Sequence, residues 1–173
     1  MNAVKNAWVV LAMLLMGAAP AAGHQHDFDF EFGSWRADVK ILQHPFSGSH
    51  TYSDLRGTSV VHKIWGGRAN YGVLEIGNAA MHIEGLTLRI FDPRSSTWNV
   101  YFSDNGSPLS VPTAGGFRNG RGEFYDTERI DGRITRVRFV FSDITPTAFR
   151  FEQSFSRDAG RTWEIEWIAT FTK

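Results

Sequence analysis

The chain has no cysteine among its 173 residues, and this absence excludes several kinds of protein. It rules out a disulfide-stabilised scaffold, a thiol nucleophile and a lipid anchor on an N-terminal cysteine. A domain of this length buries enough surface to fold without such crosslinks. No charge of one sign dominates either, with 18 basic and 18 acidic side chains, so electrostatics favours neither nucleic acid nor an anionic membrane as partner.

Long apolar runs are also scarce, and the one that occurs lies near the N-terminus. Lys5 precedes an apolar stretch from Ala7 to Met16, which small residues follow up to Gly23. This order is typical of a secretory signal peptide, and the run is shorter than the ~20 residues of a transmembrane helix. We therefore expect a signal peptide at 1–23 and one domain at 24–173, periplasmic or secreted by a bacterium and without a membrane anchor. Nothing in the sequence indicates an oligomeric state.

Helical periodicity is missing after residue 30, whereas a period of two, with every second side chain apolar, recurs along the chain. In residues 35–41, for example, Arg36, Asp38 and Lys40 alternate with apolar side chains. Later segments combine an aromatic face with a face of Arg and Glu, as expected of antiparallel strands with one solvated side. The alternating segments are 35–41, 86–91 (with Leu86, Leu88 and Ile90 on the apolar face), 98–102, 137–141, 149–155 and 163–171.

Turn signals separate these segments. Asn-Gly or Asp-Gly pairs, which favour tight hairpins, occur at 105–106, 119–120 and 131–132. Roughly eight to ten strands fit in this length, and closing them into a ring removes exposed edges. The pattern predicts an all-β domain, a single antiparallel up-and-down β-barrel of roughly eight to ten strands, with a β-sandwich as the alternative.

The start of the first predicted strand resembles a known signature. Gly33-x-Trp35, preceded by HDFDFEF at 26–32, is similar to the signature of lipocalins and calycins. In that family the tryptophan closes the barrel floor and an arginine from the end of the chain packs over it, a role that the resemblance gives to Arg150 or Arg161. Segments 88–104 and 115–173 resemble an uncharacterised bacterial domain-of-unknown-function family of lipocalin-like barrels, which implies a barrel but no activity.

The barrel interior is the candidate binding site, because barrels of this size hold one small molecule. We predict that it binds a small hydrophobic or aromatic molecule; the alternative is a filled, ligand-free barrel in a structural or stress-accessory protein. Alternation places four tryptophans and a glutamine inward, whereas it leaves the faces of His62 and Tyr125 open. The candidate lining residues are Trp35, His62, Trp98, Tyr125, Gln153, Trp163 and Trp167.

Catalytic and cofactor motifs are lacking. No serine lies in a G-x-S-x-G elbow, and the glycine-rich segment 115–122 precedes a strand, whereas a phosphate loop opens a helix, so no cofactor is expected. An isomerase, cyclase or hydrolase acting inside the barrel is the alternative function, with an acid/base pair drawn from His62, Glu75, Tyr125 and Gln153. We interpret Glu164 and Glu166 as partners in surface salt bridges in preference to a proton-sharing dyad.

Histidine spacing indicates no metal centre, because His44, His50, His62 and His82 form no H-x-x-x-H pattern. His24 and His26 are the one exception to consider. A chain beginning at His24 would offer its amine and the His26 imidazole to copper or nickel. A disordered polar start is the alternative, and we expect no metal site.

Overall fold

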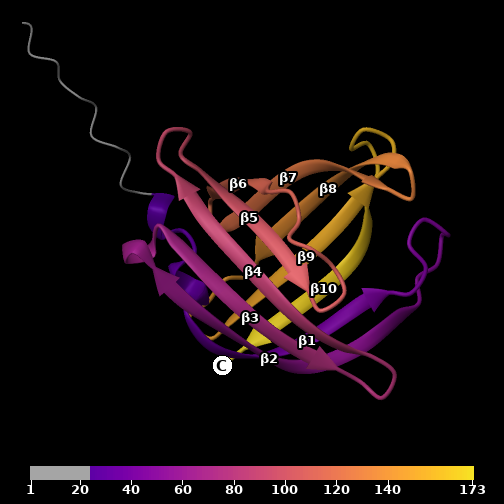
Figure 1. Cartoon of the computed structure of the whole chain (residues 1–173), viewed down its shortest axis with the longest axis horizontal. Helices are drawn as coiled ribbons and strands as arrows, with labels where there is room; N and C mark the ends of the chain where they lie inside the picture. The colour runs from indigo at the N-terminus through magenta and orange to yellow at the C-terminus, as the bar shows by residue number, and fades with distance from the viewer. Residues whose placement is uncertain (1–23) are drawn as a thin grey trace, which may run out of the picture.

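The computed structural model describes residues 24–173, which form a closed barrel of ten antiparallel strands (Figure 1). Each strand pairs with its neighbours in the chain, and β1 pairs with β10 to close the ring. The strands are β1 (Gly33–Leu42), β2 (Tyr52–Ile64), β3 (Ala69–Gly77), β4 (His82–Asp92), β5 (Thr97–Asp104), β6 (Thr113–Arg118), β7 (Arg121–Ile130), β8 (Arg133–Ser142), β9 (Ala148–Ser156) and β10 (Glu164–Thr172). The predicted all-β up-and-down barrel is confirmed, and the β-sandwich alternative is wrong. The signal peptide predicted over residues 1–23 lies outside the described residues.

Helix is confined to three short 3-10 turns in this part of the chain. They are η1 (His24–His26), η2 (Asp29–Glu31) and η3 (Trp65–Gly67). Within residues 24–173, none of these helices has the length and apolar character needed to cross a bilayer.

Side chains of β1 point alternately into the barrel and toward water. Trp35, Ala37 and Val39 are almost fully buried, whereas the intervening charged residues are exposed. Lys40 Nζ lies 2.6 Å from Asp54 Oδ1 on β2, one of two ion pairs that join these strands on the outer face. Such exposed pairs contribute about 0.2–1 kcal/mol each, so apolar burial is the main force that orients the strand.

Two of the predicted hairpins have the expected backbone. Asn119 and Gly120 join β6 to β7, and Asp131 and Gly132 join β7 to β8, each as a two-residue loop. All four residues have positive φ, between 49° and 74°. This is the conformation that Asn-Gly and Asp-Gly pairs favour in tight turns.

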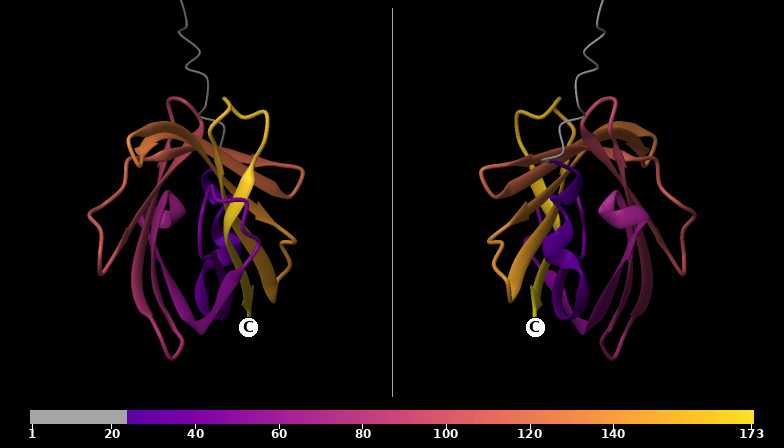
Figure 2. Two further views of the ribbon diagram at one scale, coloured as in Figure 1. Left: turned by 90° about the vertical axis from the view of Figure 1, so that its right-hand side faces the viewer. Right: turned by 90° about the vertical axis from the view of Figure 1, so that its left-hand side faces the viewer.

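The N-terminal segment, residues 24–32, closes one end of the barrel as a plug (Figure 2, indigo). Phe28 is fully buried, and its ring lies 4.9–5.6 Å from the rings of Trp98, Phe117, Phe124 and Phe141. The main chain of the plug also accepts hydrogen bonds from two indoles, Trp98 to His24 O at 2.8 Å and Trp35 to Glu31 O at 2.6 Å. The plug therefore satisfies the polar atoms of both tryptophans while filling the closed end.

A lysine occupies the place that the lipocalin resemblance gave to an arginine. Lys173 Nζ lies 4.5 Å from the centre of the Trp35 ring. Arg150 instead pairs with Glu152 on its own strand, and Arg161 donates to the Asp158 carbonyl in the β9–β10 turn. The expectation for Arg150 or Arg161 is wrong, because the chain end brings Lys173 closer to the indole.

Candidate functional site

Above the plug, the barrel contains a cavity of about 250 Å³. Aromatic rings, aliphatic side chains from β2, β3 and β5, and several polar side chains line its wall. Small-molecule pockets in proteins are built in this way, from apolar side chains with a few polar groups among them. The aromatic lining residues are Phe102, Phe139, Phe141, Phe149, Phe151, Trp167 and Phe171.

The cavity floor carries a buried ion pair. Glu31, from the plug, and Arg89, from β4, both line the cavity, with exposed fractions of 1% and 7%. Arg89 Nη2 lies 2.8 Å from Glu31 Oε2, and Arg89 Nη1 donates to Asn70 Oδ1 at 2.9 Å. The guanidinium also lies over the rings of Phe28 and Phe141.

Several polar atoms of this floor have no hydrogen-bond partner among residues 24–173. They are both carboxyl oxygens of Glu31, Arg89 Nε and Asn70 Nδ2. The 2.8 Å approach of Arg89 to Glu31 therefore provides charge attraction without hydrogen-bond geometry. Burial raises the pKa of Glu31 to about 7, and the neighbouring Arg89 only partly opposes this rise.

A second acid lies on the cavity wall. Glu166 on β10 accepts a hydrogen bond of 3.1 Å from Gln153 Nε2 on β9. Burial, and to a smaller extent the charge of Glu164, raises the pKa of Glu166 to about 7. The prediction that Glu164 and Glu166 form surface salt bridges is wrong. Glu166 faces the interior, and the Glu164 carboxylate accepts a hydrogen bond of 2.6 Å from the backbone N–H of Phe46.

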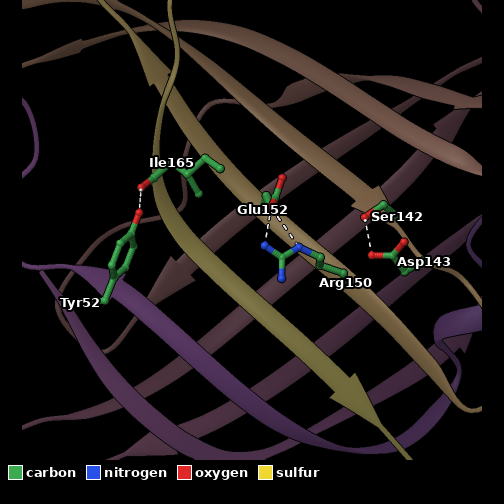
Figure 3. A network of polar contacts seen from close by, with 6 residues as sticks. All are labelled: Tyr52, Ser142, Asp143, Arg150, Glu152 and Ile165. Atoms are coloured by element: carbon green, nitrogen blue, oxygen red, sulfur yellow. Dashed lines mark hydrogen bonds and ion pairs between the residues drawn. The ribbon is translucent and has the colours of Figure 1, made fainter. Parts of the chain in front are cut away.

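An irregularity in β10 explains why Glu166 points inward. The pairing with β9 shifts between Ile165 and Trp167, so Glu166 and Trp167 both reach the cavity although they are adjacent. A β-bulge has this effect because it places one extra residue on one strand. Tyr52 on β2 stabilises the bulge by donating to the Ile165 carbonyl at 2.7 Å (Figure 3).

Four predicted site residues lie inside the barrel, in two places. Gln153 and Trp167 line the cavity. Trp35 and Trp98 are buried in the closed end, where Trp35 packs against Phe149 and Trp98 against the plug. The inward orientation predicted for these four is confirmed, and the two buried tryptophans are part of the packed core.

The other three candidates lie on the outer face. The inward position predicted for Trp163 is wrong, and His62 and Tyr125, whose faces alternation left open, point outward. His62 is exposed and stacks on Tyr71, because the preceding Val61 is the inward residue of β2. Tyr125 is 36% exposed between two inward residues of β7, and its hydroxyl donates to Glu123. Trp163 precedes the bulge and packs against the Arg138 guanidinium, 4.3 Å from its ring centre.

Sequence reasoning missed the polar residues that matter most in the cavity, Glu31, Arg89 and Glu166. Arg89 was not predicted because the apolar face of residues 86–91, expected to point inward, points outward. Leu86 on that face is 43% exposed, whereas Arg89 on the opposite face is buried. Glu31 lies in the alternating segment 27–32, Asp-Phe-Asp-Phe-Glu-Phe, where a period of two places it on the polar face; a 3-10 turn at Asp29–Glu31 buries it instead. The available signal was a charged residue between apolar neighbours. The same pattern occurs on strands whose charged face is exposed, so it does not show that the charge is buried.

The structure adds no support for a metal centre. Within residues 24–173, no group of three or more His, Asp or Glu side chains is arranged to hold a metal ion. His24 and His26 instead lie within 3.0 and 3.1 Å of carboxylates of the same segment, Asp27 and Asp29.

Comparison with known proteins supports the fold. No family model matches the chain, and no curated protein matches it by sequence. Among solved structures, the S-type phycobiliprotein lyase CPES from Guillardia theta is similar, with a TM-score of 0.56 over 84% of this chain and 89% of that chain. At 10% sequence identity this likeness shows the fold alone. The chain thus has a lipocalin-like barrel fold, whereas membership of the uncharacterised bacterial family stays a prediction.

Proposed function

We propose that this protein binds one small apolar or aromatic molecule inside the barrel, and that a signal peptide at residues 1–23 directs it to the periplasm or out of the cell. The observation that carries the binding proposal is the cavity of about 250 Å³, which seven aromatic and three aliphatic side chains line. The structural neighbour is named a phycobiliprotein lyase. We take from it the fold and no substrate.

Apolar burial supplies the affinity in this proposal. Each Å² of apolar surface removed from water contributes about 25 cal/mol, and association costs several kcal/mol in lost freedom. For a ligand of one or two rings we expect dissociation constants on the order of 1–100 μM.

The two alternatives have less support. The predicted acid/base pair of an enzyme is not assembled, since His62, Glu75 and Tyr125 lie on the outer face. A ligand-free structural protein would have a filled barrel, and the cavity argues against that.

A cavity-blocking variant tests the proposal. N-phenylnaphthylamine, whose fluorescence rises in apolar surroundings, is titrated against the wild type and Thr87→Phe, which adds a ring at the cavity wall. The matched control is Thr58→Phe, with the same change at an exposed position of β2. We expect saturable binding that Thr87→Phe weakens at least about tenfold and Thr58→Phe leaves unchanged. Equal binding by Thr87→Phe, or no saturable signal from the wild type, would contradict the proposal.

A further inference from the structure

The floor of the cavity is formed by a buried ion pair. Arg89 and Glu31 are both more than nine-tenths buried there, and both line the cavity. Both oxygens of Glu31 and the Nε of Arg89 have no hydrogen-bond partner among the described residues. Buried polar atoms without partners destabilise a fold, so their presence in a cavity wall points to a group that binds against them.

The two floor charges are not equally permanent. An arginine stays protonated in proteins, although burial lowers the pKa of Arg89. Glu31 accepts a proton near neutral pH, because burial raises its pKa to about 7. The floor is therefore neutral when Glu31 is ionised and positive when Glu31 is protonated.

We propose that the ligand of this cavity carries a carboxylate, which binds at the floor against Arg89 while the apolar part of the ligand lies among the aromatic rings. A carboxylate matches the planar guanidinium, which forms paired, charge-assisted hydrogen bonds with two oxygens. The class of ligand is thus a small aromatic or aliphatic carboxylic acid. This inference depends on the proposed function, because it names the ligand class of the same cavity.

Binding of such an acid takes up a proton at the floor. Two carboxylates beside one guanidinium repel each other, so the ligand favours the protonated form of Glu31. Arg89 is the charged side chain that acts on Glu31, and Asn70 beside them is neutral. Asp104 and Glu166 are the other titratable groups of the cavity wall. The affinity for an acid therefore rises as the pH falls through the pKa of Glu31.

Matched probes test the charge preference. Naphthylacetic acid, naphthylacetamide and naphthylethylamine share one apolar body and differ in the charge of the polar end. Calorimetric titrations at about pH 6 and pH 8 should show the acid binding at least about tenfold more tightly than the amide at the lower pH. The acid should lose about five- to tenfold in affinity at the higher pH, whereas the amide should not change.

Variants assign this pH dependence to its residue. Glu31→Gln should tighten binding of the acid at about pH 8 and remove the pH dependence, an effect opposite to that of structural damage. Glu75→Gln, the same change on the exposed face of β3, is the matched control and should leave the difference between acid and amide and its pH dependence. The double variant Arg89→Gln/Glu31→Gln should bind acid and amide equally, and unchanged amide binding reports an intact cavity.

The outcomes separate this inference from the function on which it rests. Equal, pH-independent binding of acid and amide would overturn the carboxylate subsite and leave the binding function in place. Preference for the amine would also overturn it, because Glu31 would then be the group that the ligand contacts. Failure of all three probes, together with N-phenylnaphthylamine, would contradict the proposed function itself.

Discussion

Glu31 and Glu166 differ from the surface acids of this barrel because burial raises their pKa to about 7 in both cases. In an unfolded chain the same groups titrate near their ordinary value of 4.5. Between these two pH values the folded state binds more protons than the unfolded state. Their contribution to stability is therefore fully present at acidic pH and is lost as the pH rises toward 7.

Glu166→Gln should reduce this pH dependence. Glutamine keeps a polar partner for Gln153 but carries no charge, so the variant should be more stable than the wild type at about pH 8, by on the order of 1–3 kcal/mol, and similar to it at about pH 5. Urea unfolding across this range measures the difference. Glu75→Gln, on the exposed face of β3, is the control and should follow the wild type. Parallel curves for Glu166→Gln and the wild type would show that the Glu166 carboxyl is not desolvated.

Phe28→Ala should lower the free energy of unfolding by about 3–5 kcal/mol, because it removes a fully buried ring that contacts four other aromatic rings. Ile134→Ala is the control, since Ile134 is 67% exposed and its truncation should change stability by less than about 0.5 kcal/mol. Urea unfolding of both variants is the measurement. A loss below about 1 kcal/mol for Phe28→Ala would mean that the plug is not part of the cooperative core.

At the scale of the strand, alternation predicted which side chains share a face but not which face is buried. For β1 the aromatic and aliphatic face was the inner one, as Trp35 shows. For β4 the apolar Leu86 is outside and Arg89 inside, since a period of two allows either face of a strand to turn inward. The bulge at Glu166 has no local sequence signal, so neither buried charge of these strands was predictable from periodicity.

Two adjacent glycines in β6 differ in the space around them: one lies against the neighbouring strand and the other faces open space. A Cβ atom at Gly115 would lie 2.0 Å from the Glu123 carbonyl oxygen, whereas a Cβ atom at Gly116 has nothing within 4 Å. Gly115→Ala should therefore lower the free energy of unfolding by at least about 3 kcal/mol, because β6 and β7 must separate. Gly116→Ala should be neutral or stabilise the protein by up to about 1 kcal/mol. Thermal unfolding of the two variants tests this, and equal melting temperatures would contradict the observed spacing of the strands.

At the scale of the whole molecule, the closed barrel followed from strand length, turn signals and the Gly33-x-Trp35 resemblance. The cavity did not follow, because its volume depends on how far the plug enters the barrel. Phe28 and its neighbours fill the closed end of the barrel. Glu31 lies at the boundary between this packed end and the cavity. The interior is thus part packed core and part cavity, a division that the sequence pattern does not predict.

The central claim is that this interior receives a small aromatic molecule, and the position of one bound atom tests it most directly. Crystals of the protein soaked with bromonaphthalene report the bromine through its anomalous scattering. We predict a bromine peak inside the barrel, in contact with Phe102, Phe151 and Trp167. Bromine peaks on the outer face alone, with the interior closed by its own side chains, would contradict the account.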